Sequence, residues 1–171
     1  PWFQVYGVAN SGIEQYFSSI TPAISNWTSD GFAIGGWSSA IGGFGNSWML
    51  KVDQNGALVW NTLISGTSGS NGDITGIIER LNSSAVYEYY GTTSQNTNQM
   101  TVFKLDQTGT LYPSVNNEFE YTYAGGAAAY VTAVWPGSTY GDGIQVFGTD
   151  ISNSDTYMVK AYFNGASGNL S

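Results

Sequence analysis

The sequence predicts an all-β fold built from repeated antiparallel strands. Short segments rich in β-branched and aromatic residues recur along all 171 residues, and Gly, Asn, Asp or Ser separates one from the next. The nearest thing to a helical segment, 14–24, is rich in Ser and β-branched residues and contains Pro22. In addition, one strand-and-turn sequence occurs three times, which indicates internal repeats.

The repeat is clearest in the strand and tight turn of 51–60. Its sequence, Lys51-Val-Asp-Gln-Asn-Gly56-Ala-Leu-Val-Trp60, returns at 104–112 and more faintly at 160–165. In such a turn the Asp carboxylate accepts nearby backbone amides, and Gly adopts the positive φ that ends a hairpin. A repeat of roughly 50 residues with four short strands is typical of a β-propeller blade.

Taken in order, the strand-like segments form three units within a single array, 1–171, with unit boundaries near 1–58, 59–113 and 114–171. In each unit an aromatic residue opens the first strand, and a Lys is the second-last residue of the fourth. The expected strands are 2–7, 15–20, 31–36 and 47–52, then 60–66, 74–78, 85–91 and 100–105, then 119–125, 130–135, 143–148 and 156–161. Gly36, Gly91 and Gly148 end corresponding strands and are expected to allow close approach of blades or a bulge.

The combined pattern W-x(4,5)-G, D-G-[FY]-x-[IV]-x-G and K-[VL]-D-x-x-G-x-[LV]-x-W resembles the short tandem β-propeller repeats of secreted and cell-surface proteins. The resemblance covers nearly the whole chain and implies four-stranded antiparallel blades of about 55 residues. The second unit departs from the pattern at Tyr112, where the first has Trp60, and the third lacks the Asp of the turn. Because such repeats are scaffolds, the resemblance implies a fold more than a function.

Three blades are too few to close a ring, since propellers have about 4–8. We therefore expect blade faces and strand edges that need a neighbour. The neighbour is either another copy of the chain, in a closed oligomer or a filament, or further blades of a longer chain.

Composition excludes several functions. The chain has 12 acidic and 4 basic residues, net charge −8, and neither His nor Cys. This disfavours nucleic-acid binding, Ser-His-Asp or Cys-His catalysis, and zinc sites of the usual ligands. Only 9% of residues are charged and 15% are aromatic, which favours an extracellular or cell-surface protein. No run of 18 apolar residues predicts a membrane span.

Acidic residues give two further candidate sites. Glycoside hydrolysis needs two carboxylates about 5–10 Å apart, and Glu79 with Glu88 or Glu118 with Glu120 have strand spacing. Solvated strand faces explain both pairs better, so we predict no enzyme. Calcium is the cofactor that the oxygen-rich loops would suit, but none matches a calcium-loop motif and turn formation explains them; we therefore predict no cofactor. These loops contain Asp53, Asn55, Asn71, Asp73, Asp142, Asp150 and Asp155.

Surface aromatics and glycosylation motifs complete the candidates. Trp37, Tyr87 and Tyr89 are candidate sugar-stacking or interface residues. Asn26, Asn82 and Asn169 each begin an N-x-[ST] motif. The sequence thus predicts a non-enzymatic, extracellular structural protein whose blades pack with other copies. The alternatives are a carbohydrate-binding propeller module and a piece of a larger surface adhesin.

Overall fold

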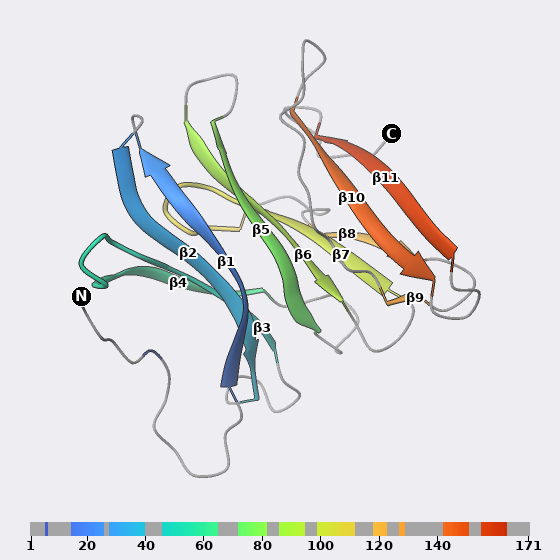
Figure 1. The fold of residues 1–171 in the computed structure, drawn as a ribbon, viewed down its shortest axis with the longest axis horizontal. Helices are drawn as coiled ribbons and strands as arrows, with labels where there is room; N and C mark the ends of the chain where they lie inside the picture. Colours follow the sequence, from blue (N-terminus) through green and yellow to red (C-terminus); the bar gives the residue numbers. More distant parts are fainter. Residues whose placement is uncertain are drawn as a thin grey trace.

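The computed structural model confirms the all-β prediction. It describes residues 6, 15–25, 28–39, 46–64, 72–81, 86–94, 99–111, 118–122, 127–128, 142–150 and 155–163. Every regular element in these ranges is a strand, and the strands form three separate antiparallel sheets that do not close into a ring (Figure 1).

The first two sheets are four-stranded meanders. The first has the order β1 (Gln15–Ser25), β2 (Thr28–Ser38), β3 (Asn46–Val52) and β4 (Leu58–Ile64). The second repeats it with β5 (Asp73–Leu81), β6 (Tyr87–Ser94), β7 (Gln99–Leu105) and β8 (Glu118–Thr122). The third has β9 (Ala127–Ala128), β10 (Asp142–Asp150) and β11 (Asp155–Phe163), with β10 in the middle.

The strand grouping differs from the prediction by one strand. Segments 60–66 and 119–125 were expected to open the second and third units. Instead β4 pairs with β3, with Trp60 opposite Lys51, and β8 pairs with β7, with Phe119 opposite Val102. The reason is the tight turn after β3, which returns the chain antiparallel to the strand it has just left. Each of these segments therefore completes the preceding sheet.

The repeated turn forms as predicted in the first two sheets. Gly56 and Gly109 have φ of 81° and 79°. The Asp53 carboxylate accepts the amides of Asn55 and Ala57, both at 2.8 Å. Asp106 does the same for Thr108 and Thr110. Burial alone would raise the pKa of Asp106, but the Thr108 hydroxyl and these two amides together hold it below its ordinary value.

The glycines that were expected to allow close approach, Gly36 and Gly91, are tightly packed. They do not lie opposite corresponding residues of the next strand. Gly36 lies opposite Trp48, and a Cβ there would collide with the Tyr16 carbonyl oxygen. Gly91 lies opposite Phe103, and its Cβ would strike that ring. Both glycines therefore serve packing beside their own sheet's strands. Backbone pairing places Gly148 opposite Tyr157.

Candidate functional site: the two faces of the first sheet

The first and second sheets pack face to face. Strand alternation assigns Ala33, Gly35 and Met49 to one face of the first sheet, called the inner face here, which lies against the second sheet. A Cβ on Gly35 would lie 2.6 Å from both Ile74 Cγ2 and Ile77 Cδ1. Only glycine at this position lets β5 approach so closely. The buried cluster between the sheets comprises Ala33, Met49, Ile64, Ile74, Tyr89, Phe103 and Leu105.

Polar side chains of the first sheet bind the start of β5. The Tyr16 hydroxyl donates to the Asp73 carboxylate. The Ser18 hydroxyl donates to the carbonyl of Ile74, and the Ser47 hydroxyl to that of Gly72, each at 2.5 Å. These bonds satisfy backbone carbonyls that would otherwise be buried without a donor. They also fix the position of β5 relative to the strands of the first sheet.

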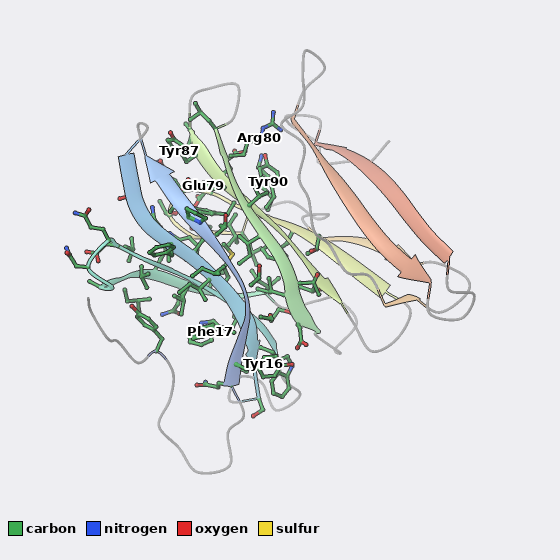
Figure 2. The ribbon with its side chains drawn as sticks, in the orientation of Figure 1. Tyr16, Phe17, Glu79, Arg80, Tyr87 and Tyr90 are labelled. Carbon is green, nitrogen blue, oxygen red and sulfur yellow. The ribbon has the colours of Figure 1, made fainter. Side chains whose placement is uncertain are left out.

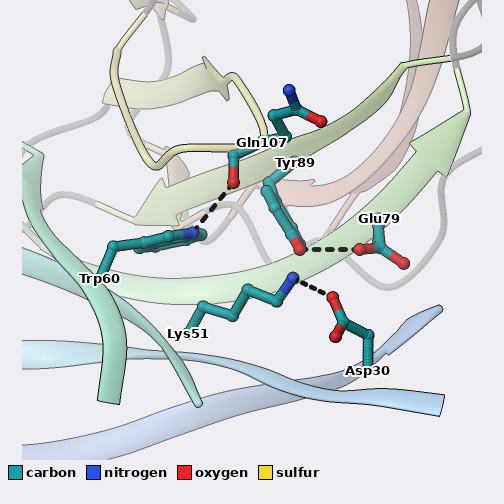
Figure 3. A network of polar contacts seen from close by, with 6 residues as sticks. All are labelled: Asp30, Lys51, Trp60, Glu79, Tyr89 and Gln107. Atoms are coloured by element: carbon teal, nitrogen blue, oxygen red, sulfur yellow. Dashed lines mark hydrogen bonds and ion pairs between the residues drawn. The ribbon is translucent and has the colours of Figure 1, made fainter. Parts of the chain in front are cut away.

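Strand β4 rests on the turn of the second sheet. The Trp60 indole N–H donates to the Gln107 carbonyl at 3.2 Å (Figure 3). Its ring meets Tyr89 edge-on, with centroids 5.3 Å apart, and a Cβ on Gly109 would lie 2.5 Å from Trp60 Cδ2. The Thr62 hydroxyl donates to the Gly109 carbonyl. The fourth strand of one sheet thus recognises the turn of the next.

An ion pair lies beside this contact. Lys51 Nζ is 2.6 Å from Asp30 Oδ2 and 5.9 Å from the Tyr89 ring centroid (Figure 3). The Tyr89 hydroxyl donates to Glu79 at 2.7 Å. Burial, followed by the Glu79 hydrogen bond and charge, raises the pKa of Tyr89, so the phenol stays neutral.

The second sheet has a corresponding ion pair, which is more deeply buried. Lys104 Nζ is 2.9 Å from Glu88 Oε2, and Glu88 is 1% exposed. The Tyr90 hydroxyl also donates to Glu88, at 2.7 Å, and Lys104 lies 5.4 Å from the Tyr90 ring centroid. Because Phe103 on the same strand faces the first sheet, Lys104 faces away from it.

The candidate carboxylate pair Glu79 and Glu88 does not form. Glu79 lies opposite Tyr89 on the side of β5 and β6 that faces the first sheet, whereas Glu88 binds Tyr90 on the other side. Figure 2 shows Glu79 and Tyr90 on these opposite sides. The two carboxylates therefore cannot flank one bond. The side chains of Glu118 and Glu120 lie outside the described residues.

The candidate calcium ligands are placed only in part. Asp53 binds backbone amides of its own turn, and Asp73 accepts Tyr16. Among the side chains that the structure describes, no three acidic residues are arranged to hold a metal ion. Asn71 and the side chains of Asp142, Asp150 and Asp155 fall outside the described part.

The predicted aromatic candidates have three different environments. Trp37 stacks on Tyr16, with centroids 5.7 Å apart, and Tyr16 is 45% exposed. Tyr87 is half-buried at the start of β6, opposite Leu81. Tyr89 is fully buried between the two sheets, so its ring offers a sugar no surface. The glycosylation candidates Asn26, Asn82 and Asn169 lie outside the described residues.

The opposite face of the first sheet, called the outer face here, was not singled out by the sequence analysis. It carries a second apolar cluster of Trp48, Leu50 and Val52, which are buried within the chain at 8%, 0% and 0% exposure, joined by the partly buried Phe32 and Ile34. On β1, Phe17 stacks on Trp48 with centroids 5.4 Å apart, and Ile20 pairs with Ile34. Phe17 is 43% exposed and Ile20 62%. The bulge between Phe17 and Ser19 obscured this alternation in the sequence.

The outer face corresponds to the face that the second sheet buries on the first. Aligning Lys51 with Lys104 matches Leu50 and Val52 with Phe103 and Leu105. The latter two pack against the first sheet. The outer face thus has apolar residues at the same strand positions as the face of the second sheet that packs against the first sheet.

Tyr6 contacts the outer face at a corresponding point. It packs on the Trp48, Leu50 and Val52 cluster, and its hydroxyl donates to the Gly56 carbonyl. Gly56 is the counterpart of Gly109, whose carbonyl accepts the Thr62 hydroxyl. A donor from a preceding segment therefore reaches the turn glycine in both sheets.

Comparison with protein-family models and with curated proteins finds no match to this sequence. In the described ranges, no helix is long and apolar enough to cross a membrane.

Proposed function

We propose that the three sheets are propeller-type blades of a non-enzymatic extracellular structural protein that assembles with copies of itself. The outer face of the first sheet carries this proposal. It repeats the face by which the second sheet packs on the first; Leu50 and Val52 at its centre are buried within the chain, whereas Phe17 and Ile20 on β1 are 43% and 62% exposed. The occupant is the third sheet of a second copy, because the sheets follow one another along the chain.

The physical driving force is burial of apolar side chains. Removing a Phe or Ile side chain from water contributes about 1.5–3 kcal/mol when burial is complete. A contact between the first sheet of one copy and the third sheet of the next is head-to-tail. Such contacts make a ring when the rotation closes and a filament when it does not.

Two further observations support the non-enzymatic and extracellular parts of the proposal. Glu79 and Glu88 each bind a tyrosine hydroxyl on opposite sides of their sheet, and Lys104 neutralises Glu88. Both carboxylates are therefore used in contacts that hold the strands together. The charged fraction of 9% suits a secreted surface rich in Ser, Thr and Asn.

Hydroxyl-radical footprinting tests the assembly face, with Tyr16 and Phe17 as a matched pair. The two residues are neighbours with exposures of 45% and 43%, but they lie on opposite faces of the first sheet; both are labelled in Figure 2. On going from dilute to concentrated protein, oxidation of Phe17 should fall severalfold while that of Tyr16 stays constant. Equal oxidation of Phe17 at all concentrations would count against the proposal.

Carbohydrate binding is a second candidate, favoured by the stack of Tyr16 on Trp37. A stack of an exposed Tyr16 and a half-buried Trp37 next to a carboxylate, here Asp73, is a surface on which a sugar ring can stack. Binding of oligosaccharides would change tryptophan fluorescence, and Trp37→Ala would remove that change. If millimolar mono- and oligosaccharides leave the fluorescence unaltered, this candidate is excluded.

A further inference from the structure

The first strands of the two four-stranded sheets carry a β-bulge at the same place. The bulge follows Phe17 in β1 and Ile74 in β5. Because a bulge shifts the register at one defined position, it aligns the two strands residue by residue. Phe17 is thus the counterpart of Ile74, and three residues further along each strand Ile20 is the counterpart of Ile77.

Polar contacts at the bulge support this alignment. The bulged residue carries a hydroxyl group in both strands, Ser18 in β1 and Thr75 in β5. The Ser18 hydroxyl is 3.5 Å from the Gly35 carbonyl oxygen, and the Thr75 hydroxyl is 3.3 Å from that of Thr92. Gly35 and Thr92 therefore hold the same position in the second strands of their sheets.

The residues after the bulge in β5 are those that dock the second sheet on the first. A Cβ at Gly35 would lie 2.6 Å from both Ile74 Cγ2 and Ile77 Cδ1, and 3.0 Å from Ile74 Cβ. Ile74 is fully buried in this contact. Its counterpart Phe17 is exposed on the outer face, and so is Ile20. The outer face thus presents the docking residues of β5 without a sheet to receive them in the described part of the chain.

The face that receives β5 recurs in the second sheet. Thr92 holds the position of Gly35, and Tyr90 lies two residues before it on the same face of β6. Both are buried, at 1% and 0% exposure. This face is therefore covered within the chain in both sheets whose side chains the structure describes.

The backbone pairing of the third sheet gives the corresponding position there. Gly35 lies opposite Met49 in the pairing of β2 with β3, and Phe147 lies opposite Met158 in the pairing of β10 with β11. An Asp-Gly dipeptide begins five residues before this position in both strands. Phe147 therefore holds the register position of Gly35 in the last sheet that the structure describes.

We propose that β1 of one copy docks across β10 of a second copy, as β5 docks on β2 within the chain. Phe17 and Ile20 of the first copy then meet the position of Phe147 in the second. This inference rests on the proposed assembly and specifies which strands of the two copies are in contact. Burial of the two exposed side chains of β1 provides the driving force.

Disulfide trapping between two separately made single-cysteine variants tests the proposal, because the natural chain has no Cys. Phe17→Cys is mixed with Phe147→Cys under mild oxidation, with one variant carrying a mass tag. The corresponding Cβ atoms within the chain are 3.0 Å apart when one is placed on Gly35. A residue larger than glycine widens this spacing toward the roughly 3.5–4.5 Å that a disulfide needs.

The matched control replaces Phe147→Cys by Val146→Cys. Position 146 is the neighbouring residue of β10, and strand alternation assigns it to the opposite face. Ile20→Cys, used in place of Phe17→Cys, is a second probe, because its counterpart Ile77 also contacts the Gly35 position.

The proposal predicts a mixed disulfide at least about fivefold more abundant with Phe147→Cys than with Val146→Cys, a ratio on the order of 1 kcal/mol of preference. The solution mass of the unaltered chain is measured at the same concentration. If that chain assembles but neither Phe17→Cys nor Ile20→Cys prefers Phe147→Cys, docking of β1 on β10 is overturned and the proposed assembly stands. If the unaltered chain stays a monomer, both are overturned.

Discussion

Replacing Lys104 by Met is expected to lower the free energy of unfolding by about 3–5 kcal/mol, because it removes a cation that lies against a buried carboxylate. Glu88 is 1% exposed and has Lys104 at 2.9 Å. Tyr90 continues to donate to Glu88 but carries no charge. Urea denaturation followed by tryptophan fluorescence measures the loss as a lower midpoint at unchanged slope.

Lys51→Met is the matched control, because Lys51 occupies the same place in the preceding repeat. Its partner Asp30 has a side chain that is 44% exposed, so water solvates the carboxylate once the lysine is gone. The expected loss is below about 1 kcal/mol. A second change, Glu88→Leu, should restore most of the stability lost in Lys104→Met. Equal losses for the two lysine variants would show that the buried position of Glu88 is assigned wrongly.

Ile20→Lys is expected to abolish assembly while leaving each chain folded. Ile20 is 62% exposed, so its removal costs the isolated chain little. On an outer face covered by another sheet, the added ammonium must be desolvated without a partner, which costs several kcal/mol. Each 1.4 kcal/mol weakens association tenfold. Light scattering would report the average mass, and circular dichroism would verify the strands.

Leu81→Lys is the control for this variant. Leu81 is 44% exposed, at the end of β5 in the second sheet and away from the outer face. The variant adds the same charge, so any effect of net charge alone appears in both proteins. The assembly account predicts an unchanged mass for Leu81→Lys. Similar loss of mass in the two variants would point to charge rather than to the outer face.

The local chemistry of the repeat was predictable from the sequence. Asp53 and Gly56 specify the turn through bonds and a φ value that act over four residues, and Asp106 and Gly109 repeat it. The described strands other than β9 follow from the same short-range patterns, whereas the expected strands 2–7, apart from Tyr6, and 130–135 lie outside the described residues. The grouping of strands was predicted one strand out of step, because the repeat in sequence begins at Trp60 whereas hydrogen bonding places that residue in the preceding sheet.

The faces of the sheets could not be predicted in the same way. Tyr87 and Tyr89 share a face, yet only Tyr89 is buried, because Trp60 from another sheet covers it. The strand spacing of Glu79 and Glu88 did not reveal that they lie on opposite sides. The bulge after Phe17 shifted the alternation of β1 and concealed the outer face. These features depend on register and on contacts between sheets, which one sequence does not specify.

Sedimentation velocity of the unaltered chain tests the central claim most directly. A chain whose outer face receives another copy should sediment as multiples of 18.3 kDa, with the average mass rising with concentration. A single 18.3 kDa species across the micromolar and millimolar range would contradict self-assembly through the outer face.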